Sequence, residues 1–494
     1  MTADWDPDSY AALIPPEKSR RKPKDTTVPT IGCALTDIGN AERFSAKWRG
    51  RVRYCYGRDR WLVWDGRRWA WDAGGEITRF AIETVRSIYS EGARAATADE
   101  RSKISEWAVK SESASALANM LRVAKDMPGI GVQLVELDSN PLLLNCENGT
   151  IDLATGKLLA HDASDLITKL CPCEFHSSAK HPTWEKFITG ATQGDAELAA
   201  YIQRAAGYGL QGNASERALF FVYGPPGSAK STLIDALGAA IGDYHVASGR
   251  ETWLVQKNPG GNRGDLVRLA GARLVTATEF RRGDKFDEGL IKQVTGGDAI
   301  TAAAKYEGEV TFRPTFTLFF AANAAPVIRD DDAGMWVRMR RIPFDHAIPE
   351  AEQDKSIKQT LQLDPAARAA VLAWAVQGCL NWGTQGIGQA KAVTKSNEAY
   401  RAEMDPIGEF FKLCKFGKEE QITAGAFRKA YKTWCEDNGI RYQLERRDIE
   451  ERLKPYGARY ATIRGKQWVK GIDMLGDYED PQPSLYPEWN EKEG

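Results

Sequence analysis

The chain of 494 residues lacks a long apolar run, a basic leader and an excess of either charge. Its two most apolar windows, 316–328 and 369–380, contain Asn323 and Gln377 and are shorter than the ~18 apolar residues of a transmembrane helix. The start, MTADWDPDSY, is acidic where a signal peptide is first basic and then apolar. We therefore expect a soluble protein of the cytoplasm with no membrane partner.

Cysteine is also sparse, and eight residues scattered over the chain indicate reduced thiols and not a disulfide framework. Lys and Arg number 66 and Asp and Glu 67, so the net charge of -1 excludes a globally basic coat protein. With 43% hydrophobic and 27% charged residues, the composition is that of a folded globular protein. At about 150 residues per domain, this length corresponds to roughly three domains.

Shifts in composition and periodicity divide the chain into five parts. Both ends are rich in proline and charge, which is typical of tails that do not order. The central part alternates apolar strands with helical patterns, which predicts a parallel sheet with helices on its faces, an α/β fold. In order, the parts are a flexible tail (1–34), a mixed α/β domain (35–192), the parallel-sheet domain (193–390), a winged-helix domain predicted from two helices and a hairpin (400–478) and a disordered tail (479–494).

The mixed α/β domain contains a predicted hairpin that is rich in tryptophan. Short alternating segments on either side of an Asp-Gly turn are a strong hairpin signal. The rings could stack on single-stranded bases, but aromatic residues at period two more often pack in a core, and we favour packing. The four residues are Trp61, Trp64, Trp69 and Trp71. A helical stretch over 77–127 and two short strands joined by Thr155-Gly156 are expected to follow.

A phosphate-binding loop is the clearest chemical motif. The apolar strand RALFFVY runs into GPPGSAKST and then into a helical pattern, so that backbone amides and a helix N-terminus can bind phosphate groups. In such a loop Lys230 reaches the β and γ phosphates of a triphosphate and the Ser231 hydroxyl ligates Mg²⁺. Ala229 replaces the second glycine, and its methyl group could weaken binding. The alternative is a glycine-rich turn with a solvated lysine. The candidate binding residues are Gly224, Pro225, Pro226, Gly227, Ser228, Ala229, Lys230, Ser231 and Thr232.

Two later strands also end in polar residues. ARLVTATEF ends near Glu279, whose carboxylate could orient an attacking water and help to hold Mg²⁺. Many ATPases have two adjacent acids at this point, whereas this chain has Thr278 before Glu279. FTLFFAAN ends in Asn323, whose amide suits a hydrogen bond to the γ phosphate or the attacking water. We expect Asn323 to lie between the loop and Glu279.

Arginines cluster downstream in RDDDAGMWVRMRRIPF, which contains Arg338, Arg340 and Arg341. In ring ATPases a neighbouring subunit inserts an arginine that stabilises transition-state charge, a role that suits the planar guanidinium. The alternative is salt bridges with the acidic run 330–332. The sequence does not decide between Arg338 and Arg340 for the first role.

Positive charge gathers near the C-terminus, where residues 423–474 hold 12 Lys or Arg against 7 Asp or Glu. Arg446 and Arg447 belong to the second predicted helix of this domain, and Arg464 and Lys466 to the hairpin. These positions predict contacts with DNA phosphates. The alternative is a solvated helix face.

The series Cys171, Cys173, His176 and His181 has a spacing that could hold Zn²⁺. However, the two cysteines flank a single residue, whereas most zinc hairpins use C-x2-C. We therefore expect no zinc site here.

Taken in order and spacing, GPPGSAKST, ARLVTATEF, LIKQVTGGD, FTLFFAANAAPVI and GMWVRMRRIPF resemble superfamily 3 helicases of the phage, plasmid and poxvirus primase-helicase type. The resemblance extends upstream to the domain that precedes the helicase and downstream to a winged helix. It implies an AAA+-like P-loop ATPase domain in a hexameric ring, which hydrolyses ATP with Mg²⁺ and threads DNA during replication of a mobile element. The location would then be the cytoplasm of the host cell.

The resemblance also implies roles for single residues. Lys230 and Ser231 would bind triphosphate and Mg²⁺, Glu279 would be the Walker B acid, and Asn323 the sensor. Arg338 aligns best with the arginine finger.

In the same family a pore hairpin grips single-stranded DNA, and Lys305 and Tyr306 match it, while the winged helix would bind duplex DNA. Ala229, Ala303 and Val337 depart from the family pattern and put robust turnover in doubt.

The tail before residue 35 has no room for a primase domain, so we expect a separate primase or polymerase as partner. Two alternatives stay open: an ATPase that melts an origin or loads a helicase without processive unwinding, and a degenerate DNA-binding scaffold.

Overall fold

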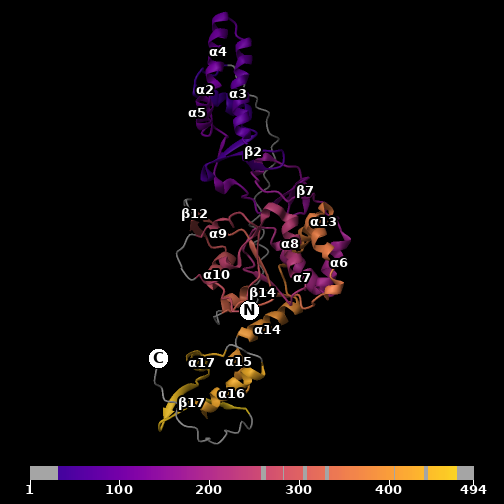
Figure 1. Ribbon diagram of the computed structural model, residues 1–494, viewed down its shortest axis with the longest axis vertical. Helices are drawn as coiled ribbons and strands as arrows, with labels where there is room; N and C mark the ends of the chain where they lie inside the picture. Colours follow the sequence, from indigo (N-terminus) through magenta and orange to yellow (C-terminus); the bar gives the residue numbers. More distant parts are fainter. Residues whose placement is uncertain are drawn as a thin grey trace. The chain divides into compact units, whose positions relative to one another are not determined.

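The computed structural model describes residues 32–256, 263–281, 283–303, 309–328, 333–404, 406–438 and 443–475. They belong to two compact units that divide after Thr394 (Figure 1). None of the described helices has the length and apolar character needed to cross a bilayer. Almost all of the two expected tails lies outside the described residues. The boundary expected at residue 192, between the mixed α/β domain and the parallel-sheet domain, stays a prediction.

Four helices and a small sheet form the first part of the larger unit, drawn in indigo in Figure 1. The expected helical stretch over 77–127 is interrupted twice, because Thr97 and Ser113 accept hydrogen bonds from main-chain amides and begin new helices. The sheet has the order β3-β2-β1-β4. The elements are α2 (Asp37–Trp48), β1 (Val52–Cys55), β2 (Arg60–Trp64), β3 (Trp69–Trp71), α3 (Glu76–Ala93), α4 (Ala98–Ser111), α5 (Ala114–Ala124) and β4 (Gly131–Val132).

The tryptophans of the β2–β3 hairpin pack against neighbouring residues. Trp69 is fully buried and its Nε1 donates to the carbonyl oxygen of Ala163 across 2.8 Å. The ring of Trp61 lies edge-on to that of Tyr54, with 5.1 Å between their centroids. These contacts confirm the packing interpretation for Trp61 and Trp69.

A second small sheet and two helices connect this part to the main sheet. Three strands form where two were expected, namely β5 (Leu143–Cys146), β6 (Gly149–Asp152) and β7 (Lys157–Leu159). They are followed by α6 (Pro182–Ala191) and α7 (Ala196–Tyr208). The turn at Thr155-Gly156 joins β6 to β7, as predicted.

The main sheet has five parallel strands in the order β14-β8-β13-β10-β9, which confirms the predicted parallel α/β sheet. Because successive side chains of a strand point to opposite faces, Phe220 contacts Tyr201 and Tyr208 of α7 whereas Phe221 contacts Phe280 on the other face. Figure 1 shows α7, α8 and α13 on one side of this sheet and α9 and α10 on the other. The strands are β8 (Leu219–Tyr223), β9 (His245–Ala247), β10 (Leu274–Thr278), β13 (Thr317–Ala322) and β14 (Met339–Pro343).

Helices and a separate strand pair complete the larger unit. They are α8 (Lys230–Ile241), α9 (Gly264–Val267), α10 (Glu288–Gly296), β11 (Ile300–Ala303), β12 (Glu309–Phe312), α11 (Ala333–Arg338), α12 (Lys355–Leu363) and α13 (Pro365–Gln385). Helix α14 (Lys391–Met404) runs across the division between the two units.

The smaller unit contains α15 (Pro406–Phe411), β15 (Cys414–Thr423), α16 (Ala424–Asp437), α17 (Arg446–Leu453), β16 (Arg459–Ile463) and β17 (Lys466–Met474). Its antiparallel sheet has the order β15-β17-β16. The predicted hairpin turns at Arg464-Gly465, both with positive φ. Strand β15 was not predicted, and the winged-helix assignment stays a prediction.

Candidate functional site

The loop 224–229 joins the buried strand β8 to helix α8. Gly224 has no room for a side chain, because a Cβ there would lie 2.0 Å from the carbonyl oxygen of Phe344. Gly227 and Ala229 have φ values of 78° and 65°, in the left-handed region that favours glycine. Ala229 is the N-cap residue of α8, and its methyl group cannot accept from the first amides of the helix. The loop therefore presents main-chain donors that suit an anion.

Lys230 is the first residue of α8 and is held over this loop. Its Nζ donates to the carbonyl oxygens of Gly224 and Pro225, at 2.9 and 2.6 Å, and to Oγ of Ser228 at 3.0 Å. The residue is 7% exposed, and burial lowers the pKa of its ammonium group. Lys230 thus places a positive charge beside the amides of the loop, whereas Ser231 on the same turn is exposed.

The two other expected site residues follow neighbouring strands at the same edge of the sheet. Strand β13 lies between β8 and β10, with Ala322 paired to Tyr223 and Ala321 to Thr278. Asn323 and Glu279 directly follow these strands, and both are exposed. With neighbouring strands about 4.8 Å apart, the carboxyl ends of β8 and β10 are separated by about 10 Å. The register thus brings Glu279, Asn323 and the loop to one edge in the expected order.

The backbone at Glu279 is strained and is held by a residue that the motifs did not indicate. Glu279 has a φ of 65°, which costs about 1–2 kcal/mol for a residue with a side chain. Nη1 of Arg250 donates to the carbonyl oxygen of Glu279 across 3.2 Å and to Oδ2 of Asp284 at the same distance. The Asp284 carboxylate also accepts from the amide of Arg281 at 2.7 Å. The sequence signal that could have indicated this role is the position of Arg250, three residues after the short strand β9.

No group of three or more His, Cys, Asp or Glu side chains among the described residues is arranged to hold a metal ion. Mg²⁺ in phosphate-transfer sites is bound by one or two protein ligands together with phosphate oxygens and water. The Ser231 hydroxyl and the Glu279 carboxylate are both exposed. They lie at the edge of the sheet where the loop would bind a phosphate, so both could ligate such an ion. The site therefore fits an ion that is shared with a bound phosphate.

Arg338 lies at the opposite edge of the sheet from the loop. It directly precedes β14, where Met339 is paired with Leu219, and the loop follows the other end of β8. Five residues at about 3.3 Å each place these edges about 15 Å apart. Nε of Arg338 donates to Oγ1 of Thr295 in α10 across 2.9 Å. Arg338 therefore does not approach the loop of its own chain.

The other two arginines of this cluster belong to β14. The guanidinium of Arg341 is buried and lies 3.6 Å from the ring centroid of Tyr223, whereas Arg340 is partly exposed. The acidic run 330–332, the expected alternative partner, lies outside the described residues.

The two proposed pore residues, Lys305 and Tyr306, also lie outside the described residues. The strands on either side of them, β11 and β12, form an antiparallel pair in which Ala303 is opposite Glu309.

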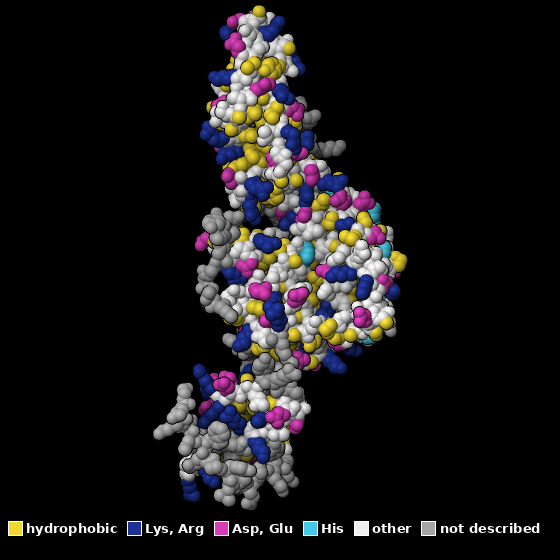
Figure 2. All heavy atoms as spheres, viewed as in Figure 1, with side chains coloured by type: hydrophobic (Ala, Val, Ile, Leu, Met, Phe, Trp, Pro, Cys, Tyr) yellow, Lys and Arg dark blue, Asp and Glu magenta, His cyan; other side chains and the backbone are white. Residues whose placement is uncertain are grey.

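The basic residues expected to bind DNA are exposed on the smaller unit. Arg446 and Arg447 begin α17, and Arg464 and Lys466 lie at the tip of the β16–β17 hairpin. Figure 2 shows Lys and Arg side chains on the visible face of this unit, beside atoms drawn in grey.

Of the four residues with zinc-like spacing, the two cysteines are buried and the two histidines contact other groups. Cys171 and Cys173 are buried in the core, where burial raises the pKa of both thiols. His176 contacts Glu174 across 3.1 Å. His181 begins α6, and its Nδ1 accepts from the amide of Thr183.

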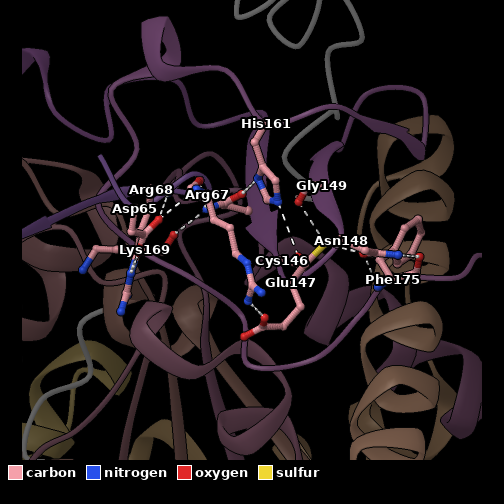
Figure 3. Close-up of polar contacts among 11 residues, drawn as sticks. Asp65, Arg67, Arg68, Cys146, Glu147, Asn148, Gly149, His161, Lys169 and Phe175 are labelled. Atoms are coloured by element: carbon pink, nitrogen blue, oxygen red, sulfur yellow. Dashed lines mark hydrogen bonds and ion pairs between the residues drawn. The ribbon is translucent and has the colours of Figure 1, made fainter. Parts of the chain in front are cut away.

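A polar cluster connects the turn of the β2–β3 hairpin to the β5–β6 hairpin (Figure 3). Arg67 forms an ion pair with Glu147 and Arg68 with Asp243, which follows α8. Nδ2 of Asn145 donates to the carbonyl oxygen of Arg67 across 3.0 Å. These contacts hold the N-terminal hairpin against the part of the unit that carries the loop.

Comparisons with known proteins show what two segments of the chain resemble. Residues 41–193 match the family described as D5 N terminal like, and residues 222–341 match a family of unknown function, DUF5906. A mimivirus protein named "Putative helicase L207/L206" (Acanthamoeba polyphaga mimivirus) is 29% identical over 231 residues, covering 46% of this chain and 24% of the relative. "Putative primase C962R" of African swine fever virus is 24% identical over 302 residues, covering 56% and 31%. Over these segments the chain is therefore similar to viral proteins that are named putative helicases or primases.

The second matched segment contains Lys230, Glu279, Asn323 and Arg338. The chain matches 24% and 31% of the length of the two named relatives. Among solved structures, the apo C-terminal region of NrS-1 is 11% identical, with 88% of this chain and 99% of that chain covered and a TM-score of 0.47.

Proposed function

We propose that the chain is an ATP-dependent DNA helicase that unwinds DNA during replication of a phage, plasmid or other mobile element. The observation that carries this proposal is the meeting of three strand ends at one edge of the main sheet. The loop with Lys230, the amide of Asn323 and the carboxylate of Glu279 follow the adjacent strands β8, β13 and β10. The names of the viral relatives support a role in DNA replication.

In this proposal the loop amides, the N-terminus of α8 and Lys230 bind the triphosphate. Ser231 and Glu279 would hold Mg²⁺, which when bound would neutralise charge that develops on the phosphates. Asn323 orients the attacking water or the γ phosphate. The exposure of Ser231, Glu279 and Asn323 leaves these side chains accessible to a nucleotide.

We further propose a ring, with six subunits as the expected number, because Arg338 lies at the edge of the sheet away from its own loop. A neighbouring subunit could present Arg338 to the triphosphate, where its guanidinium stabilises transition-state charge. Lys305 and Tyr306 would grip single-stranded DNA in the pore. Arg446, Arg447, Arg464 and Lys466 would contact duplex DNA, and a separate primase or polymerase would supply primers.

The nucleotide site is tested by measuring ATP hydrolysis with and without DNA. Lys230→Ala should abolish hydrolysis, because no other described cation lies in the loop. Lys157→Ala is the matched control, since Lys157 is exposed on β7, and should retain wild-type turnover. Equal hydrolysis by the wild type and Lys230→Ala would refute the proposal and favour the scaffold alternative, which the methyl group at Ala229 motivates.

The ring is tested by mixing two inactive proteins. Arg338→Ala has an intact loop and Lys230→Ala an intact arginine, so mixed rings should recover part of the DNA-stimulated turnover. Arg340→Ala, mixed in the same way, tests the other candidate. No recovery in either mixture would contradict an arginine supplied by a neighbour.

An origin-melting or helicase-loading ATPase is the second candidate function, favoured by the basic charge on the smaller unit. Strand displacement on a long forked DNA separates the two functions. Melting limited to a short duplex would support the second candidate over processive unwinding.

A further inference from the structure

The smaller unit contains a cavity of about 220 Å³ between α16, α17 and the β16–β17 hairpin. Gly425 and Arg428 belong to the start of α16, and Arg446 and Ile449 to α17. Tyr460 of β16 and Gln467 of β17 contribute from the sheet.

Two arginines give this cavity its positive charge. The guanidinium of Arg446 lies 4.5 Å from the centroid of the Tyr460 ring. Burial raises the pKa of the Tyr460 hydroxyl, while the charges of Arg446 and Arg428 oppose this rise and nearby Glu450 adds to it. Arg428 lines the same cavity. Within the part of the chain that the structure describes, neither Arg428 nor Arg446 forms an ion pair.

The main chain adds further donors beside the arginines. Helix α16 has 14 residues, and its N-cap Thr423 accepts from the amide of Ala426. The first amides of a helix have no partner within the helix, and Gly425 lies in this turn. A Cβ on Gly425 would have no atom within 4 Å, so this side of the cavity is open.

We propose that this cavity binds a phosphate group of a nucleic acid backbone. Guanidinium groups match the geometry of phosphate oxygens, and the Gln467 amide can donate to the same group or to the adjacent sugar. The ring of Tyr460 and the side chain of Ile449 offer an apolar surface to that sugar. The volume is below the range of about 300–1,000 Å³ that is typical of sites for whole small molecules.

A nucleic acid, and not a free phosphate ion, is the ligand that the surroundings favour. Arg447, Arg464 and Lys466 are exposed on the same helix and hairpin. A chain of phosphates can contact them while one phosphate occupies the cavity, whereas a single ion contacts only the cavity. This inference rests on the proposed role of the chain on DNA, and it adds Arg428, Tyr460 and Gln467 to the residues expected from the sequence.

The sharpest test adds a charge without filling the cavity. Gly425→Asp places a carboxylate where the structure has space, and Gly425→Asn is the control of equal shape. In fluorescence anisotropy with labelled DNA, full-length chain and no ATP, we expect Gly425→Asp to bind about fivefold or more weakly than Gly425→Asn. Equal binding by the two variants would overturn the proposal.

A second test removes each arginine. Arg428→Ala and Arg446→Ala should each weaken DNA binding about 5- to 10-fold and reduce the slope of log K against log salt by about 0.7–0.9, the value for one phosphate contact. Lys429→Ala removes the same charge from an exposed position on α16 outside the cavity and should have a smaller effect. Thermal unfolding confirms that each variant is folded. Arginine variants that bind no worse than Lys429→Ala would refute the inference.

Inorganic phosphate distinguishes the source of the ligand. If wild-type chain bound inorganic phosphate through Arg428 while its DNA affinity did not depend on Arg428, the nucleic acid proposal would be wrong. Basal ATP hydrolysis without DNA should be unchanged in the control Lys429→Ala, which alters neither the larger unit nor the cavity. A chain without ATP hydrolysis that still binds DNA through this cavity would contradict the proposed function and leave this inference intact.

Discussion

Nη1 of Arg250 donates to the main-chain oxygen of Glu279 across 3.2 Å, and thereby fixes the residue that follows strand β10. The same atom donates to Asp284, so Arg250 links Glu279 to Asp284 in the segment that follows β10. Because Glu279 has a positive φ, its backbone depends on such support. Arg250 is therefore a positioning residue for the proposed acid.

Arg250→Gln should lower kcat for ATP hydrolysis about 10- to 100-fold, since small displacements of a catalytic group have effects of this size. KM for ATP should change little, because Arg250 does not belong to the loop that holds Lys230. Steady-state kinetics measure both constants, and Arg250→Lys should recover part of kcat. Arg281→Gln is the control, as the side chain of Arg281 is exposed. An unchanged kcat in Arg250→Gln would show that Arg250 does not position Glu279 for catalysis.

Ala229→Gly should stabilise the chain by up to about 1 kcal/mol, because glycine adopts the positive φ at this position without the cost that alanine has. Nucleotide binding should also strengthen. Ala236→Gly, in the buried middle of α8, is the control and should destabilise by about 1 kcal/mol or more. Urea denaturation measures both changes, and a loss of stability in Ala229→Gly would show that the backbone is not strained there.

His245 should make the larger unit less stable in mild acid. Burial lowers the pKa of His245 below its ordinary value of 6.5, with the nearby Asp235 opposing this shift. Between the folded and unfolded pKa values the unfolded chain binds more protons, so stability is lost as pH falls through this window and returns as pH rises. His245→Gln should flatten this dependence in urea denaturation at pH 5 to 7, which brackets the ordinary pKa. His176→Gln, at an exposed position, should leave it unchanged.

Arg273→Leu should destabilise the chain by about 2–4 kcal/mol, because buried carbonyl groups lose a charged donor. Arg273 is 5% exposed and donates to the carbonyl oxygens of Leu210 and Leu143 at 2.6 and 2.7 Å. The bond to Leu143 connects the residue before β10 to β5, and the bond to Leu210 connects it to the segment after α7. Arg268→Leu changes an exposed arginine of the same segment and should shift the free energy of unfolding by no more than about 0.5 kcal/mol.

The sequence predicted the three inner strands of the main sheet because each is a largely apolar run between polar residues. It did not predict the two outer strands. Strand β9 has only three residues, and β14 contains Arg340 and Arg341, which resemble a surface segment. Arg341 is tolerated on a buried strand because its guanidinium covers the ring of Tyr223, a contact that only the folded chain reveals.

Within the candidate site, the positions of Glu279 and Asn323 follow from the rule that parallel strands end at a common edge. The role of Arg250 could not be inferred in this way, because its bond to Glu279 joins residues 29 apart in sequence. The cavity around Tyr460 could not be predicted from the sequence either. It needs two helices and a hairpin to fold before Arg428 and Arg446 come together.

Arg338 and the loop before Lys230 lie at opposite edges of one sheet. If both act on the same triphosphate, a single molecule holds one half of each of two sites. Specific activity would then depend on protein concentration and would fall steeply on dilution, even while each molecule remained folded and bound to nucleotide.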